Sequence, residues 1–188
     1  MSSAVRLLVL GAILRRGVSH GYGVYRDITA WRAETWTKVK PGSIYHAMTK
    51  LESQGLLKTE DSGDLIKRGP SRTEYTVTPQ GCDEFESLLE DALTSFDVEW
   101  FSSGIAFMDR LPRNRVVILL EERLTRLEEN DTFLKTLPTE AVPSDPSRHP
   151  ELVGLWIGYI EFALIKTRHL IQSLQAGEYQ FSDESNVR

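Results

Sequence analysis

The chain of 188 residues contains a single cysteine, Cys82, and no uncharged stretch longer than nine residues. One cysteine excludes a disulfide within the chain and a metal site built from a cysteine cluster, and such scarcity is typical of a reducing cytosol. A membrane-spanning helix needs about 18 to 20 mostly apolar residues in a row, so none is predicted. Hydrophobic residues make up 40% of the chain. We therefore expect a cytoplasmic protein with a buried core and no membrane partner.

The charges are divided unevenly along the chain. Residues 1–80 hold 12 Lys and Arg against 7 Asp and Glu, a net charge of +5, whereas residues 81–188 carry a net charge of −10. A basic segment attracts polyanions, and nucleic acid is the commonest partner of that kind. The split predicts two functions on one chain, with the polyanion partner on the amino-terminal half.

Hydrophobic periodicity predicts three helices in the basic half. Residues 4–16 are apolar over most of a helix circumference, which favours a helix packed on several sides. A second helix is expected over residues 21–33, with one apolar face formed by Val24, Ile28 and Trp31. Pro41 and Gly55 are start and stop signals for a third helix over residues 41–54.

The period changes after the third helix. Residues 56–61 form a short strand candidate, and residues 73–77 alternate between apolar and polar side chains, as a half-exposed strand does. The polar loop between them carries three cations, Lys67, Arg68 and Arg72. Two strands joined by such a loop predict a β-hairpin. Three helices followed by a hairpin is the order of elements in a winged helix-turn-helix.

The third helix is expected to have two distinct faces. Ile44, Met48 and Leu51 follow the spacing of one buried helical face. The opposite face carries Ser43, His46 and Lys50, which are the hydrogen-bonding and cationic groups that a helix in a DNA major groove presents. An ordinary amphipathic surface helix has the same pattern, so the basic hairpin loop and the nearby Lys38 and Lys40 carry the DNA interpretation.

Three segments of the basic half resemble the PadR-type transcriptional regulators. They are residues 20–24 (HGYGV), 41–57 (PGSIYHAMTKLESQGLL) and 69–81 (GPSRTEYTVTPQG), in the order and spacing of that family, and the resemblance covers roughly residues 4–85. It implies a dimeric winged-helix regulator, usually a repressor, whose carboxy-terminal helices form the dimer. The longer carboxy-terminal half is similar to the branch with the larger dimerisation domain. Gly23 departs from the family, which often has an acidic residue there.

Carried over by motif, the resemblance implies that Tyr22, Ser43, Tyr45 and Lys50 lie at or near the DNA, with Arg72 in the wing. Phosphate contacts fix the register of such a protein on DNA, and base contacts select the sequence. Together with the cations around the third helix, the predicted DNA-binding residues are Tyr22, Lys38, Lys40, Ser43, Tyr45, His46, Lys50, Lys67, Arg68 and Arg72.

The acidic half is predicted to be helical and to form the dimer. One helix is expected from residue 79 through the apolar face that ends at Phe96, another begins at Leu111-Pro112, and the last covers residues 151–176. The last helix is apolar over so much of its surface that burial on both sides is expected, and a partner subunit supplies that burial economically. The predicted dimerisation residues are Phe85, Leu89, Phe96, Leu152, Trp156, Tyr159, Ile160 and Ala163.

An aromatic segment, which Gly104 is expected to break, lies between the two regions. Trp100, Phe101, Phe107 and Met108 form either a packed corner between helices or part of a cavity for an aromatic or lipophilic effector. Cys82, at a helix start, is either a half-buried structural residue or a redox-sensing thiol. No arrangement of nucleophile, base and orienting group predicts an enzyme, and neither a metal site nor a cofactor is expected.

The sequence therefore predicts a mainly α fold with a small β-hairpin wing. We expect a winged helix-turn-helix DNA-binding domain over residues 1–82, a helical dimerisation and effector domain over 83–178, and a disordered tail over 179–188. The predicted function is that of a homodimeric, sequence-specific DNA-binding regulator of a palindromic operator, a repressor relieved by a small molecule. The alternative is a winged-helix protein-interaction module without sequence-specific DNA binding.

Overall fold

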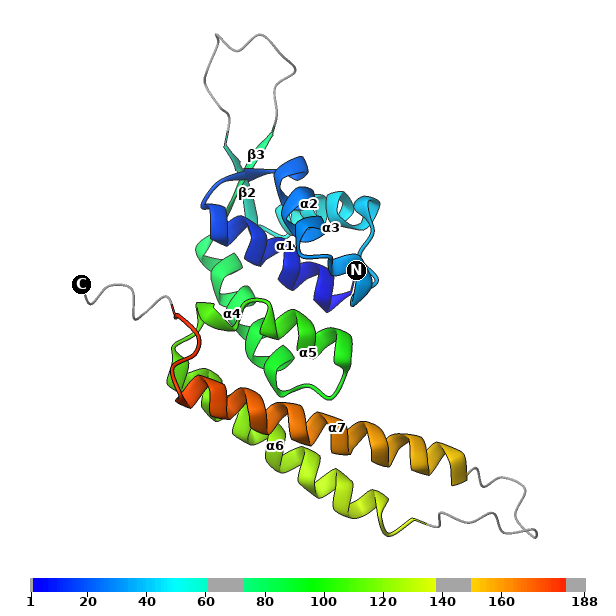
Figure 1. The fold of residues 1–188 in the computed structure, drawn as a ribbon. Helices are drawn as coiled ribbons and strands as arrows, with labels where there is room; N and C mark the ends of the chain where they lie inside the picture. Colours follow the sequence, from blue (N-terminus) through cyan, green and yellow to red (C-terminus); the bar gives the residue numbers. More distant parts are fainter. Residues whose placement is uncertain (1, 61–72, 138–149, 182–188) are drawn as a thin grey trace. The chain divides into compact units, whose positions relative to one another are not determined.

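The computed structural model describes residues 2–60, 73–137 and 150–181 (Figure 1). The chain divides into two compact units, Met1–Met108 and Asp109–Arg188. The first unit extends past residue 82, where we expect the winged-helix domain to end, because the two helices that follow the hairpin pack on the first helix of the chain. The functional boundary after residue 82 stays a prediction. Among the described helices, none is long and apolar enough to cross a membrane.

The first unit combines helices with a small antiparallel sheet, which confirms the predicted fold class. A short 3-10 helix, η2 (Met108–Arg110), spans its carboxy-terminal boundary. The preceding elements, in chain order, are α1 (Ser3–Arg16), β1 (Ser19–His20), α2 (Gly21–Ala30), the 3-10 helix η1 (Ala33–Thr35), α3 (Pro41–Ser53), β2 (Leu57–Glu60), β3 (Glu74–Val77), α4 (Pro79–Thr94) and α5 (Val98–Ile105).

Helix α1 is the centre of the first unit. It contacts α2, α3, α4, α5 and β3. Its residues from Leu7 to Leu10 are completely buried. A helix surrounded in this way must be apolar on nearly every side, and this explains the all-round apolar pattern of residues 4–16. Burial of each large aliphatic side chain contributes roughly 1.5–3 kcal/mol, so α1 is a main source of stability for the unit.

The hairpin lies in a three-stranded antiparallel sheet with the order β1-β3-β2. In its register Leu57 pairs with Val77 on one side of β3, and Ser19 pairs with Tyr75 on the other. The sequence did not predict β1, because two residues carry no periodicity. Gly55 has a φ of 72° between α3 and β2, a left-handed conformation that glycine adopts without steric strain.

Two further features differ from the expectations. Helix α2 ends at Ala30 instead of Ala33, because Arg32 adopts a left-handed φ of 54° and the chain then enters η1. The aromatic segment after residue 97 contains a helix, α5, which begins where the Asp97 carboxylate accepts a hydrogen bond from the Trp100 amide at 2.7 Å. Gly104 lies inside this helix and does not break it, because Ala92 and Leu93 pack close to its Cα, where a side chain would stand.

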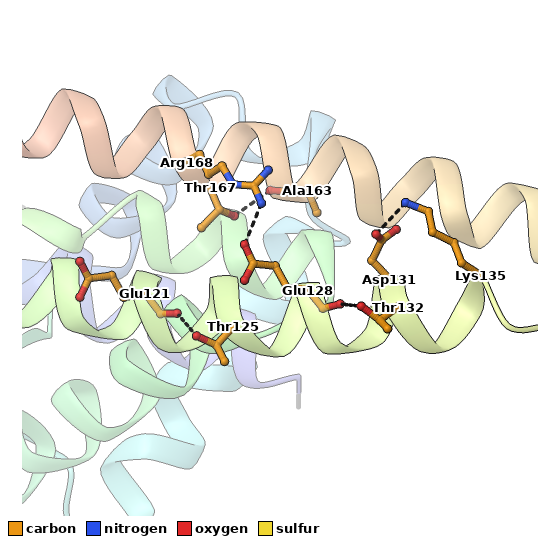
Figure 2. Close-up of polar contacts among 9 residues, drawn as sticks. All are labelled: Glu121, Thr125, Glu128, Asp131, Thr132, Lys135, Ala163, Thr167 and Arg168. Atoms are coloured by element: carbon orange, nitrogen blue, oxygen red, sulfur yellow. Dashed lines mark hydrogen bonds and ion pairs between the residues drawn. The ribbon is translucent and has the colours of Figure 1, made fainter.

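The second unit contains two long helices, α6 (Arg113–Leu134) and α7 (Pro150–Gln175), which pack side by side (Figure 1). Both agree closely with the predicted helices. Apolar side chains of α6 and α7 are buried, and they include Leu120, Leu127, Ile160, Leu164 and Leu174. Thr167 is also buried, and its hydroxyl donates to the Ala163 carbonyl at 2.8 Å within α7 (Figure 2).

Polar side chains also join the two helices of this unit. Arg168 on α7 forms an ion pair with Glu128 on α6 at 2.7 Å (Figure 2). Lys135, directly after α6, forms ion pairs with Asp131 on α6 at 2.7 Å and with Glu161 on α7 at 3.3 Å. Arg123 is only 2% exposed, and burial lowers the pKa of its guanidinium to about 10. Exposed pairs contribute about 0–1 kcal/mol each, so the apolar contacts dominate this packing.

Candidate nucleic-acid interface

The start of α3 is fixed by its own first turn. Pro41 occupies the first helical position, where its missing N–H is not needed. The Ser43 hydroxyl accepts a hydrogen bond from the Lys40 amide at 3.0 Å and donates one to the Lys40 carbonyl at 2.7 Å. Ser43 is half-buried, and its hydroxyl hydrogen is engaged in this cap. Of the predicted DNA-binding residues, Ser43 therefore also has a structural function.

Helix α3 has one buried and one exposed face, as predicted. Ile44, Met48 and Leu51 are buried against the rest of the unit. The exposed face carries aromatic, imidazole, hydroxyl and ammonium groups, from Tyr45, His46, Thr49 and Lys50. Because the buried residues hold the helix, the exposed side chains are available to a ligand without any change in the core.

The connection that leads into α3 is held from both ends. The Thr37 hydroxyl donates to the Ala33 carbonyl at 2.8 Å and accepts from the Val39 amide at 3.2 Å. The Lys38 amide donates to Glu99 Oε1, on α5, at 3.0 Å. Lys38 and Lys40 are exposed. The two predicted cations therefore stand on an ordered segment just before α3, and this segment is tied to α5.

The first turn of α2 explains the unusual glycine at position 23. His20 caps the helix, since its Nδ1 accepts a hydrogen bond from the Gly23 amide at 2.8 Å. A Cβ on residue 23 would stand 2.7 Å from Ser19 Oγ and 3.0 Å from His20 Nδ1. A larger residue at this position therefore requires a different arrangement of the cap. Tyr22 follows the cap and is 57% exposed.

A hollow of about 500 Å³ lies between α2, α3 and β3. We call it the hydroxyl hollow, because five of its described lining residues carry a hydroxyl group. Its lining residues are His20, Gly21, Tyr22, Tyr45, Met48, Thr49, Thr73 and Tyr75. The hollow therefore brings two predicted DNA-binding residues, Tyr22 and Tyr45, together with residues that sequence reasoning did not select.

The strands of the wing are described, but its loop is not. Lys67, Arg68 and Arg72 lie outside the described residues. At the base of the wing, Tyr75 on β3 is half-buried, and burial together with the nearby Glu52 carboxylate raises the pKa of its phenol. Tyr75 therefore keeps its proton at neutral pH and can act as a hydrogen-bond donor.

The predicted dimerisation residues fall in different compact units. Phe85, Leu89 and Phe96 belong to the first unit, where Phe85 and Leu89 are buried and Phe96 is half-buried. In the second unit, Ile160 and Ala163 are buried, while Leu152 and Trp156 are exposed and Tyr159 is half-buried. The exposed apolar side chains of α7, which we call the α7 face, are Leu152, Leu155, Trp156, Phe162 and Ile165.

The predicted effector residues line the core more than a cavity. Phe107 and Met108 are buried, and Trp100 and Phe101 are half-buried, with the Trp100 indole N–H donating to Asp91 at 2.7 Å. A neighbouring open pocket of about 450 Å³, the tryptophan pocket, is lined by Arg15, Trp31, Trp36, Ser102, Ile105 and Ala106. The sequence analysis assigned Trp31 to a buried helix face and did not select Trp36. The spacing of the two tryptophans, five residues apart, was the only sequence feature that could have indicated this pocket.

Comparison with known proteins identifies the amino-terminal region. Residues 9–87 match the model of the transcriptional regulator PadR-like family. None of the curated proteins matches the chain. Two solved structures show similarity over most of their length. The structure of Bacillus subtilis PadR in complex with operator DNA is 20% identical in sequence and has a TM-score of 0.38. The alignment covers 91% of this chain and 95% of the PadR chain. A PadR-like transcriptional regulator from Bacillus cereus is 16% identical, with coverages of 92% and 99% and a TM-score of 0.36.

At such low TM-scores the two structures carry no weight for the arrangement of the elements. The family match contains α2, α3, both hairpin strands and the start of α4. It therefore includes the elements of the candidate interface. It also contains the three segments whose resemblance we noted in the sequence, and so confirms that prediction. In this winged-helix region, residues 9–87 match the PadR-like family of transcriptional regulators.

Proposed function

We propose that this regulator binds double-stranded DNA in a sequence-specific manner through α3. The observation that carries the proposal is the exposed face of α3, where Tyr45, His46 and Lys50 project from a helix whose opposite face is buried. A major groove accepts one helix, and imidazole and ammonium groups there can hydrogen-bond to base edges. Lys38 and Lys40 add positive charge at the start of this helix.

We assign phosphate contacts to the wing and to the segment before α3. The loop cations Lys67, Arg68 and Arg72, although outside the described residues, follow in sequence from strands at the edge of the same unit. Phosphate contacts hold a protein in register on DNA without reading its sequence. Substitution of Lys38 should therefore weaken binding to all sequences about equally, whereas substitution of His46 should reduce discrimination among them, at about 1–3 kcal/mol for each lost base contact.

We further propose a homodimer that binds a palindromic operator through the α7 face. Five large apolar side chains are exposed along one helix, Phe162 at 58% among them. Clustered exposed apolar side chains of this kind mark interaction surfaces. Two-fold symmetry places two copies of α3 about 34 Å apart, or a multiple of this distance, on successive turns of the DNA. The dimer therefore determines which spacing of half-sites is bound.

We also propose that the protein acts as a repressor and that a small aromatic or lipophilic molecule releases it from DNA. The tryptophan pocket is our candidate site, because its volume lies within the range of ligand pockets, about 300–1,000 Å³. Trp36 stands at the beginning of the segment that leads into α3. A compound that releases the DNA should lose this effect in the Trp36→Leu variant and keep it in the Phe133→Leu control on α6, where the side chain is exposed.

Selection of bound fragments from genomic DNA tests the DNA proposal. The selected fragments should share a palindrome, and their affinity should fall steeply with salt, with a log–log slope of about −0.9 for each phosphate neutralised. Affinity that stays flat between low and physiological salt, with no shared sequence, would remove this proposal and favour a protein-interaction module.

The dimer is tested by matched substitutions of exposed phenylalanines. Phe162→Glu places a carboxylate in the α7 face and should convert the dimer to monomers in analytical ultracentrifugation. Phe133→Glu on α6, where the side chain is 60% exposed, is the control and should leave the dimer intact. A Phe162→Glu protein that remains a stable dimer would show that the seam lies elsewhere. Ile160 is unsuitable for this test, because a glutamate there would disrupt the packing of α6 on α7.

A further inference from the structure

We propose that Glu99, on α5, is a positioning residue for DNA recognition. Its carboxylate accepts a hydrogen bond from the Lys38 amide, and this contact, which we call the α5 latch, holds the start of α3 in the arrangement that binds DNA. The inference rests on the proposed function, since it concerns binding through α3. It goes further because α5 lies beyond residues 9–87, which match the family model.

The segment between η1 and α3 is held amide by amide. The amides of residues 38–40 donate to side-chain oxygens of Glu99, Thr37 and Ser43, at 3.0, 3.2 and 3.0 Å respectively. Thr37 and Ser43 lie within three residues of their donors, so these two bonds shape the segment locally. Glu99 is 61 residues away in the chain. The α5 latch therefore ties the segment to a different element of the first unit.

Helix α5 is itself well anchored, so the latch has a fixed end. The Glu99 carbonyl accepts a hydrogen bond from the hydroxyl of Ser103 at 2.9 Å, and Ser103 is completely buried. The Trp100 indole N–H donates to Asp91 on α4 at 2.7 Å. Atoms of α4 also stand 3.1 Å from the position of a Cβ on Gly104, which is close packing. The position of α5 on α4 thus fixes where the Lys38 amide is held.

The held segment leads directly into the turn that matters most for base contacts. Lys38 lies three residues before Pro41, the first residue of α3. In a helix-turn-helix, the amino-terminal residues of the recognition helix contact the base edges. Without the latch, the segment can take other conformations, and only a fraction of the molecules then has the first turn in place. The apparent affinity for DNA falls in proportion to that fraction.

The charge of Glu99 allows the latch to be tested by the sign of an effect. A carboxylate beside the exposed Lys38 and Lys40 opposes the approach of phosphate, so its removal should strengthen DNA binding on electrostatic grounds alone. Glu99→Gln removes the charge but keeps an amide oxygen that can accept the same hydrogen bond. Glu99→Ala removes both the charge and the acceptor. If the latch positions α3, the two substitutions should change the affinity in opposite directions.

The first experiment measures the affinity of the full-length protein by fluorescence anisotropy, for a duplex recovered in the genomic selection and for a mixed-sequence duplex. Glu99→Ala should bind the recovered duplex about threefold to tenfold more weakly than the wild type, whereas Glu99→Gln should bind it at least as tightly. The loss should be smaller on the mixed-sequence duplex, because phosphate contacts do not read sequence. Glu86→Ala, which removes one exposed carboxylate from α4, is the matched control and should discriminate between the duplexes like the wild type.

The second experiment follows hydrogen exchange of single amides by NMR in the absence of DNA. The Lys38 amide should exchange faster in Glu99→Ala than in the wild type or in Glu99→Gln. The Lys40 amide, which donates to Ser43, is the internal reference and should keep its rate. Circular dichroism and the melting temperature check that each variant is folded.

The inference is overturned if Glu99→Ala and Glu99→Gln bind the recovered duplex equally well, or if the Lys38 amide exchanges at one rate in all three proteins. A wild type that binds neither duplex refutes the proposed function, and the part of Glu99 in recognition with it. Wild-type binding with equal affinities for the two Glu99 variants refutes this inference alone.

Discussion

The same substitution, glycine to alanine, should have different effects on stability at positions 11 and 42. The reason is that α1 packs closely on Phe107, after α5, whereas the start of α3 has free space. Gly11 lies in the middle of α1, and a Cβ there would stand 2.4 Å from Cε1 of Phe107. Phe107 is completely buried and has ring neighbours on other sides: Phe85 at 5.7 Å and Trp31 at 5.5 Å between centroids. Unlike the exposed Tyr45, this ring has no solvent to turn into.

The magnitude follows from two opposing terms. Alanine stabilises a helix interior by about 1 kcal/mol relative to glycine. Forcing an extra carbon into a packed core costs typically 1–3 kcal/mol and occasionally more, and a 2.4 Å approach lies far below ordinary contact. We therefore expect Gly11→Ala to reduce the free energy of unfolding by about 1–3 kcal/mol. Gly42, at the start of α3, has nothing within 4 Å of its Cβ position, so Gly42→Ala should be neutral or stabilising by a few tenths of a kcal/mol.

Urea unfolding at constant pH, followed by circular dichroism, measures both variants. A third variant, Gly11→Ala with Phe107→Leu, tests the cause, because the smaller side chain vacates the space that the new methyl group requires. Its loss should be smaller than the sum of the two single losses. Gly11→Ala protein as stable as the wild type, or additive losses in the double variant, would refute the proposed clash.

Three further predictions concern stability. Arg123→Met should leave the stability of the second unit unchanged or raise it by about 1–4 kcal/mol at pH 7. The reason is that burial lowers the pKa of Arg123 to about 10, so the charged guanidinium destabilises the folded state below that pH. A loss of stability in urea unfolding at pH 7 would contradict this. Gly81→Ala should cost on the order of 3 kcal/mol or prevent folding, since its Cβ would stand 2.2 Å from the Leu56 carbonyl oxygen, a backbone atom; expression and melting temperature are the measurements. Ser43→Ala should reduce the free energy of unfolding by about 0.5–2 kcal/mol, in addition to any effect on DNA affinity, because it removes the hydrogen bond of the first turn. A change in DNA affinity without a change in stability in denaturant unfolding would contradict the capping function.

Periodicity and stop signals predicted α1, α3 and α7 almost to the residue, and the start of α6 within two residues. Those helices have several turns of apolar spacing, and Gly17 and Gly55 follow the first two of them with positive φ values. The wing strands were predicted because residues 73–77 alternate. Element α5 was not, because the sequence around Gly104 suggests a break and only its packing against Ala92 and Leu93 explains the glycine.

The site was predictable only in part, for a physical reason. The exposed face of α3 follows from helical spacing alone, so the exposure of His46 and Lys50 was predicted; their contact with DNA stays a prediction. The hydroxyl hollow brings together residues from α2, α3 and β3, and no local pattern indicates that Thr73 or Tyr75 lies near Tyr22. Similarly, Trp31 and Trp36 line one pocket together with Ile105. They meet because the chain turns between them, at Arg32 with its left-handed φ and at η1, and the sequence pattern does not indicate this turn.

The separation of packing and recognition on α3 bears on how this regulator changes during evolution. Tyr45, His46, Thr49 and Lys50 are exposed, so their replacement should cost little folding free energy. On our proposal that α3 binds DNA, such a replacement changes which DNA sequence is bound. Ser43 is the exception, because its hydroxyl also holds the first turn. On the same proposal, a duplicated copy of this chain would acquire a new operator through substitutions at these four surface positions, while position 43 would retain a residue that can cap the helix.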